Sequence, residues 1–252
     1  MQIDKMKTFI KDKTSMLFPT NNTCIFCGEE LFNGHDYSIC DECLKELPVV
    51  HNTCDICGQE IIGGGNLCLN CKRSSKKFYD RAFSPFRFEG LIVDSVHRLK
   101  YHNDKWIGKY LSKILYDYIK DLDLKIDVII PVPLNENRLK ERGYNQSRLL
   151  CEEFHRKGIT VDETNLIRVK DTKSQTNFTF KQREENMKNA FKVVDKDKLI
   201  GKNVLIVDDV YTTGATLNEI SETLRKTKVN YIYCLTLAHV VKPILTETNK
   251  LL

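Results

Sequence analysis

Two adjacent carboxylates and the polar turn behind them have the clearest chemical potential in this chain. Asp208 and Asp209 follow the apolar run 204–207, and the segment 212–216 after them holds three threonines and a glycine. The backbone amides of such a turn, together with the threonine hydroxyl groups, can bind a phosphate. A helix is expected over 217–226, and its N-terminus next to the turn favours a bound anion. The carboxylates suit the next part of such a ligand, because they accept hydrogen bonds from sugar hydroxyls or share those hydroxyls with magnesium.

This order of acids, threonines and glycine resembles the signature with which type I phosphoribosyltransferases bind phosphoribosyl pyrophosphate (PRPP). The resemblance implies that the acids hold the ribose and that the loop holds its 5′-phosphate. A Walker B segment needs a Gly-rich Lys-Ser or Lys-Thr loop upstream, which this sequence lacks. A phosphoacceptor domain and an ordinary α/β unit stay open. The implied PRPP-binding residues are Asp208, Asp209, Val210, Tyr211, Thr212, Thr213, Gly214, Ala215 and Thr216, with Asp208 and Asp209 as the catalytic pair.

A second strand and its loop are expected beside the first. The apolar segment 127–133 predicts a short buried strand, and its following loop lies at the same sheet edge as the acids if the strands are parallel. The phosphoribosyltransferase resemblance implies that this loop binds pyrophosphate and that the polar segment 171–178 is an active-site lid. The residues expected to contact pyrophosphate or substrate are Arg138, Arg142, Gln146, Gln175 and Arg183.

The other elements alternate between strands and helices, which predicts an α/β fold with a parallel sheet flanked by helices. The basic segment 97–102 has two interpretations: a contact with substrate or partner, or a solvated helix end. Strands are expected over 81–88, 166–169 and 231–239, and helices over 92–99, 106–118 and 146–157.

Eight of the ten cysteines occur in four Cys-x2-Cys pairs, which predicts two structural zinc ions bound by thiolates. Pairing neighbours closes the shortest loops and favours tandem ribbons, while a cross-braced arrangement stays open. His35 and His51 lie outside the complete cysteine sets. A redox role is the weaker hypothesis, because redox-active pairs occur singly. The expected zinc ligands are Cys24, Cys27, Cys40, Cys43, Cys54, Cys57, Cys68 and Cys71.

Composition limits the class of protein. The 252 residues are enough for a domain of ordinary size plus a smaller module. No apolar stretch is long enough for a secretory signal or a membrane span, so we expect a soluble, cytoplasmic protein. The formal charge of +5 falls close to neutral if two four-thiolate zinc sites form. The polar segment 72–77 is either a solvated linker or a contact for a phosphate backbone.

Together these features are similar to the ComF (ComFC) family of competence proteins. The features are the paired ribbons, the segments 131–133 and 142–146, Gln175 with Arg183 and Asn186, and the loop 208–216. The resemblance implies a role in natural transformation, with single-stranded DNA and a competence helicase of the ComFA type as partners. It also implies an N-terminal segment 1–23, a double zinc-ribbon domain 24–77 and a phosphoribosyltransferase-like domain 78–252.

The sequence is compatible with two classes of function. The protein is either an enzyme that displaces pyrophosphate from PRPP with magnesium, or a binding module that uses the pocket for a ligand while the ribbons dock DNA or the helicase. The intact acidic pair favours PRPP binding, because a groove for nucleic acid gains nothing from two carboxylates. The alternative function is an active phosphoribosyltransferase of nucleotide metabolism, whose acceptor no stretch of the sequence identifies.

Overall fold

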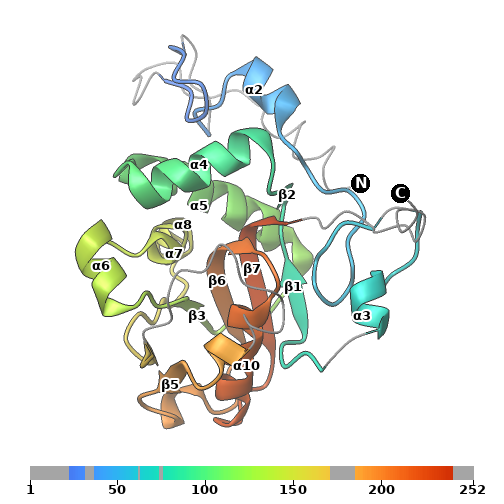
Figure 1. The fold of residues 1–252 in the computed structure, drawn as a ribbon, viewed down its shortest axis with the longest axis vertical. Helices are drawn as coiled ribbons and strands as arrows, with labels where there is room; N and C mark the ends of the chain where they lie inside the picture. The colour runs from blue at the N-terminus through green and yellow to red at the C-terminus, as the bar shows by residue number, and fades with distance from the viewer. Residues whose placement is uncertain (1–22, 32–36, 62, 74–75, 171–184, 241–252) are drawn as a thin grey trace, which may run out of the picture.

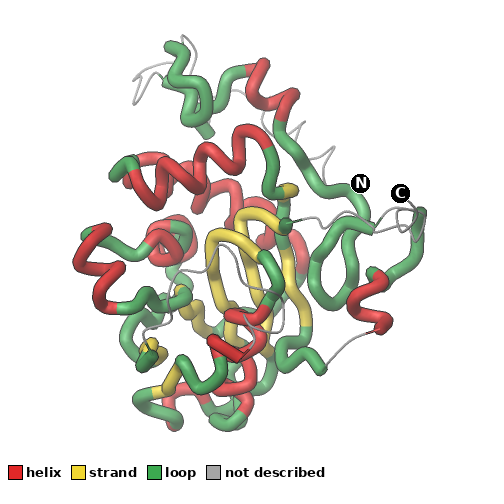
Figure 2. Tube along the Cα trace, in the orientation of Figure 1, coloured by secondary structure: helices red, strands yellow, loops and turns green. Residues whose placement is uncertain are grey.

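A parallel β-sheet forms the centre of the computed structural model, which describes residues 23–31, 37–61, 63–73, 76–170 and 185–240 (Figures 1 and 2). The strand order is β1-β7-β6-β3, and β2 pairs with β7 beyond the end of β1. Every pairing within this sheet is parallel. The strands are β1 (Arg81–Phe83), β2 (Phe86–Arg87), β3 (Val128–Pro131), β6 (Val204–Tyr211) and β7 (Ile232–His239).

Helices cover both faces of the sheet, which explains why β6 begins with four apolar residues rather than an alternating pattern. Leu205 and Val207 belong to one hydrophobic cluster with residues of α4 (Gly90–Tyr101) and α5 (Lys105–Ile119). Val204 and Ile206 belong to the other cluster, with residues of α10 (Ala215–Arg225). The two predicted helices before β3 are confirmed, although Trp106 is 38% exposed and not part of the core.

The helix expected over 146–157 is broken in the middle. The structure has α6 (Glu136–Arg142), α7 (Gln146–Leu149) and α8 (Glu152–Arg156) after β3. The hydroxyl of Ser112 on α5 donates to the carbonyl of Leu150 at 2.8 Å and accepts from the amide of Glu153 at 2.8 Å. A side chain from a neighbouring helix thus takes the place of helical hydrogen bonds at this point.

The strand expected over 81–88 is also divided. Pro85 has no backbone N–H to donate to the sheet, and Ser84 turns its hydroxyl to Thr236 at 2.6 Å. The strand expected near 166–169 is β4 (Leu166–Arg168), which pairs antiparallel with β5 (Phe191–Val193) in a separate two-stranded sheet. Short 3₁₀ helices complete the described elements at Lys120–Leu122 and Asp197–Leu199.

The two cysteine-rich ribbons pack against different parts of the sheet domain (Figure 1). The first, with α2 (Asp41–Glu46), shares a hydrophobic cluster with α4 and α5, and Tyr37 donates to Asp117 of α5 at 2.6 Å. The second, with α3 (Leu69–Arg73), lies beside β1, where the amide of Ala82 donates to the carbonyl of Ile56 at 2.7 Å. Gly58 permits this approach, because a Cβ there would lie 2.6 Å from the Ala82 oxygen.

Across the described ranges, we find no helix with both the length and the apolar character needed to span a bilayer.

Candidate functional site

The acidic pair lies within β6 and not in the loop after it. The sequence predicts that the strand ends before the acids, but pairing with β7 continues from Asp208 opposite Thr236 to Tyr211 opposite His239. Asp208 is half-buried and Asp209 is 5% exposed. The strand thus holds both carboxylates in fixed directions at its carboxyl end.

Lys100, in the last turn of α4, forms an ion pair with Asp209. Burial raises the pKa of Asp209, but the Lys100 ammonium outweighs burial and holds the pKa below its ordinary value. Burial lowers the pKa of Lys100, and the charge of Asp209 reverses this, so the net pKa is raised. The structure thus brings one lysine of the basic segment 97–102 to the acidic pair, while His97 and His102 stay exposed.

Asp208 has a different environment from its neighbour. Its Oδ1 accepts hydrogen bonds from the hydroxyl of Ser147 at 3.0 Å and from the amide of Asp209 at 2.9 Å. Burial, followed by the negative charge of Asp209, raises the pKa of Asp208 to about 7. Near neutral pH, Asp209 is charged and Asp208 exchanges between its charged and neutral forms. The pair therefore carries less than two full negative charges near neutral pH, and Lys100 neutralises one of them. Its oxygen atoms can accept hydrogen bonds from hydroxyl groups of a ligand.

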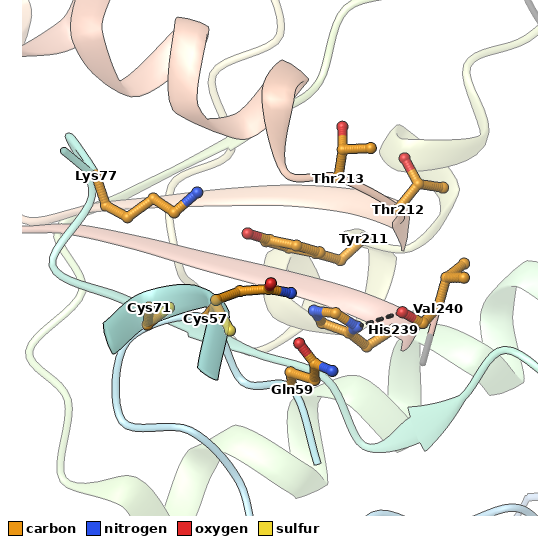
Figure 3. A pocket seen from close by; sticks show the side chains of 10 residues that line it. Cys57, Gln59, Cys71, Lys77, Tyr211, Thr212, Thr213, His239 and Val240 are labelled. Atoms are coloured by element: carbon orange, nitrogen blue, oxygen red, sulfur yellow. Dashed lines mark hydrogen bonds between the residues drawn. The ribbon is translucent and has the colours of Figure 1, made fainter. Parts of the chain in front are cut away.

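The turn after β6 is built around Gly214, whose φ is +76°. A Cβ at this position would lie 2.1 Å from the hydroxyl oxygen of Tyr211, so only glycine allows this close approach. The Tyr211 ring stacks on His239 with centroids 4.3 Å apart (Figure 3). The hydroxyl of Tyr211 lies 2.8 Å from that of Tyr79. The Tyr211 side chain therefore packs against the turn at Gly214. Within the turn, the hydroxyl of Thr213 accepts a hydrogen bond from the amide of Ala215 at 3.3 Å.

A basic cavity of about 660 Å³ adjoins the acidic pair through Lys100. Arg138 and Arg142, both predicted from the sequence, line this cavity with Lys100. Arg142 also donates to the side chain of Gln146, which is buried. The other two residues that the sequence associates with pyrophosphate or substrate, Gln175 and Arg183, lie outside the described residues, as does the segment 171–178.

The eight paired cysteines gather into two groups of four. The sulfur atoms of Cys27 and Cys40 lie 3.7 Å apart, and those of Cys57 and Cys68 lie 3.6 Å apart. A tetrahedral zinc ion with Zn–S bonds of about 2.3 Å requires S···S distances of about 3.8 Å, so these groups fit zinc. Backbone amides point at the sulfurs as well, since the amide of Cys40 donates to the Cys24 sulfur at 3.4 Å.

This grouping settles the pairing of the cysteines. Neighbouring pairs share a site, so the tandem arrangement is confirmed and the cross-braced alternative is wrong. His51 is exposed and outside both groups, and His35 lies outside the described residues. The remaining thiols, Cys151 and Cys234, are fully buried, and burial raises the pKa of both.

Family models and relatives identify the family. A double zinc ribbon domain model matches residues 14–72, and a phosphoribosyl transferase domain model matches residues 157–248. Competence protein F of Haemophilus influenzae is 38% identical over 172 residues, which cover 66% of this chain and 75% of that protein. DNA utilization protein YhgH of Salmonella typhi is 31% identical over 209 residues, which cover 80% of this chain and 89% of that protein. The chain belongs to the ComF family of competence proteins.

A third ComF relative extends the comparison: competence protein ComFC of Bacillus subtilis is 26% identical over 189 residues, which cover 73% of this chain and 76% of that protein. Solved phosphoribosyltransferases overlay loosely. A hypoxanthine phosphoribosyltransferase from Staphylococcus aureus, 21% identical, covers 56% of this chain and 65% of that chain with a TM-score of 0.31. The phosphoribosyltransferase-like fold of this ComF protein therefore rests on its parallel sheet and on the domain model.

Two residues of this ComF site were not singled out from the sequence. Lys100 was one of several basic residues at a helix end, and its only signal is its position next to the buried Leu99 of α4. Ser147 has no local signal, because it is fully buried and reaches Asp208 from α7 across 61 residues of sequence. Both contacts depend on how helices pack on the sheet.

Proposed function

We propose that this ComF-family protein binds PRPP, or a related phosphoribosyl ligand, with magnesium, and that this binding serves the handling of internalised single-stranded DNA in natural transformation. The observation that carries the proposal is the acidic pair at the end of β6 next to the glycine turn. In this proposal the protein acts in the cytoplasm with a competence helicase of the ComFA type. The zinc ribbons are structural parts of it.

The site residues have distinct roles in this proposal. Asp208 and Asp209 accept hydrogen bonds from the ribose hydroxyls, while the turn 212–216 at the start of α10 surrounds the 5′-phosphate with amides. Arg138 and Arg142 bind the pyrophosphate from the basic cavity, because a guanidinium pairs with two phosphate oxygens at once.

Magnesium fits this site as a companion of the pyrophosphate. Magnesium in proteins is held by one or two carboxylates together with substrate phosphates, and Asp208 and Asp209 supply that number of carboxylates. Lys100 already neutralises the charge of Asp209, so the two carboxylates together do not neutralise the double charge of the ion. The phosphate oxygens of the ligand would supply the other ligands, and the ion would offset the negative charge of the bound diphosphate.

The acidic pair supports a phosphoribosyl ligand over a groove for nucleic acid alone, because two carboxylates repel the phosphate backbone. The names of the relatives bear on the alternative, an active enzyme of nucleotide metabolism. The relatives are named for competence or DNA utilization, which favours a role in DNA uptake.

The decisive experiment measures thermal stabilisation of the purified protein by PRPP with magnesium. A ligand at about 100 times its Kd stabilises the folded state by roughly 2.7 kcal/mol, which corresponds to a rise of about 5 to 10 °C for a protein of this size. The double variant Asp208→Asn with Asp209→Asn is nearly isosteric and is expected to lose most of this shift. The control, Asp121→Asn with Asp123→Asn, removes the same charge from two exposed residues and is expected to keep it.

A wild-type protein that PRPP and magnesium do not stabilise would contradict the proposed ligand. An unchanged shift in the folded double variant would show that the acids do not bind it. Transformation of a competent host that carries the double variant tests the biological role, and it is expected to fall together with ligand binding.

DNA binding is tested separately, with a single-stranded oligonucleotide at several salt concentrations. We expect weak to moderate affinity that falls as salt rises, because lysines and arginines displace counterions from the phosphates. Charge reversal at Arg138 and Arg142 weakens binding if the DNA uses the basic cavity. Unchanged affinity in that variant, with loss after substitution of Lys72 and Lys76, would place the DNA on the linker instead.

A further inference from the structure

A cavity of about 250 Å³ lies between the second zinc ribbon and the turn after β6 (Figure 3). Gln59 and Asn70 line it from the ribbon, and Thr212 and Thr213 line it from the turn. Lys77, which follows the ribbon in sequence, also lines the cavity and extends its amino group toward the Tyr211 hydroxyl (Figure 3). The other lining residues are Cys57, Cys71, Tyr211, His239 and Val240. Two parts of the chain that are far apart in sequence thus share one cavity.

Apart from the sulfurs of Cys57 and Cys71, most polar groups that line the cavity are hydrogen-bond donors that suit an anion. Threonine hydroxyls, side-chain amides and an ammonium group all donate hydrogen bonds. Among the described residues that line this cavity, none carries a carboxylate. Lys77 also forms no ion pair within the part of the chain that the structure describes. Its positive charge therefore faces the cavity without an acidic partner from those residues.

The tyrosines near Lys77 do not supply the missing negative charge. Burial raises the pKa of Tyr79 and of Tyr211, so both hydroxyls stay protonated. Their mutual hydrogen bond of 2.8 Å lies next to the cavity. The negative groups that share the cavity with Lys77 are therefore the sulfurs of Cys57 and Cys71 and not tyrosinates.

The backbone next to Lys77 is fixed to the helix that begins at the turn. The amide of Phe78 donates to Asn218 of α10 at 2.9 Å, and Arg225 of α10 donates to the carbonyl of Phe78 at 2.8 Å. Arg225 also pairs with Asp80 at 2.6 Å. These contacts fix the backbone that follows Lys77 against α10, and therefore hold the lysine beside the turn at the start of that helix.

We infer that Lys77 is the cation of the phosphate subsite and binds the phosphate monoester of the phosphoribosyl ligand together with Thr212 and Thr213. This inference rests on the proposed function and adds a residue to it. The segment that leaves the second ribbon then completes the ligand site. Zinc binding by the ribbon and ligand binding by the sheet domain are coupled through this one lysine.

The test compares Lys77→Gln with Lys76→Gln by titration calorimetry. Lys76 is a matched control, because it is the adjacent lysine, is exposed, and lies over the Phe78 ring outside the cavity lining. The probes are PRPP with magnesium, ribose 5-phosphate and inorganic phosphate. Loss of a hydrogen bond to a charged group weakens binding about tenfold or more, so Lys77→Gln is expected to weaken all three ligands. Lys76→Gln is expected to bind as the wild type, and Lys77→Arg is expected to retain most of the affinity.

The outcomes separate this inference from the proposed function. If the wild-type protein binds none of the probes, the proposed function fails and the role of Lys77 fails with it. If the wild type binds PRPP and Lys77→Gln binds equally well, only the inference is overturned.

A competing role for Lys77 is to offset the charge of the zinc-bound thiolates, because Cys57 and Cys71 line the same cavity. Zinc content and melting temperature of Lys77→Gln test this role. Loss of zinc with unchanged phosphate affinity would overturn the inference. Weaker phosphate binding with about two zinc ions still bound would support it.

Discussion

The buried ion pair between Lys100 and Asp209 allows a sharp test of the site, in the variant Lys100→Met. Methionine keeps an unbranched side chain of similar length but removes the charge. Asp209, whose side chain is 7% exposed, is then left next to Asp208 without a cation. Removing one partner of a buried pair costs about 3 to 5 kcal/mol. Because the Lys100 side chain is 23% exposed, we expect the lower end of this range, about 3 kcal/mol at pH 8.

The loss is expected to depend on pH. In the wild type, the pKa of Asp209 is lowered, so its charged form stabilises the fold above the unfolded pKa and this stability is lost as pH falls through the folded pKa. In Lys100→Met, the pKa of Asp209 rises above its unfolded value instead. Its contribution to stability is then lost as pH rises. The difference between the two proteins therefore grows from pH 5 to pH 8.

Urea and thermal unfolding at both pH values measure this difference. At pH 8 we expect the midpoint to fall by roughly 6 to 12 °C, and at pH 5 by much less. Lys109→Met on the exposed side of α5 is the control, expected to change stability by about 0.5 kcal/mol or less. In Lys100→Met with Asp209→Asn, most of the lost stability is expected to return. An equal loss at pH 5 and pH 8 would refute this reasoning, because it would indicate lost packing and not an unpaired charge.

Three further predictions concern the zinc sites, the glycine turn and pH. Metal analysis is expected to find about two zinc ions per chain, and Cys54→Ser is expected to lose one of them. Gly214→Ala is expected to destabilise the protein by about 2 kcal/mol or more in urea unfolding, because the new Cβ would clash with Tyr211. The control is Gly143→Ala, at φ +75° with open space around it, which is expected to lose less stability. PRPP with magnesium is expected to bind about tenfold more weakly at pH 6 than at pH 8, since Asp208 with a pKa of about 7 must lose its proton. Calorimetry of Asp208→Asn is expected to show a much weaker pH dependence, which comes from the phosphate monoester of the ligand.

The elements of the fold that sequence predicts well are those with strong local patterns. The apolar run before the acids, the helical spacing from Ile92 to Leu99 and the final strand of the sheet are all present in the structure. Where the sequence prediction was wrong, a contact from another element overrides the local pattern. The Ser112 hydroxyl breaks the helix expected over 146–157, and pairing with β7 extends β6 through the acids to Tyr211.

The sequence by itself determined the zinc ligands and the family, because both are encoded in the spacing of residues close together in the chain. Because a Cys-x2-Cys pair can place two sulfurs at one metal, local spacing predicts the ligands, while the structure shows which pairs share a site. Only the tertiary structure decided which cations reach the site. Lys100 reaches Asp209 from α4, Lys77 lines the cavity beside the turn after β6, and each ribbon packs on its own part of the sheet domain. These positions are set by the packing of apolar faces that are distant in sequence. A lysine that this packing brings to a site has no local sequence pattern that would predict its position.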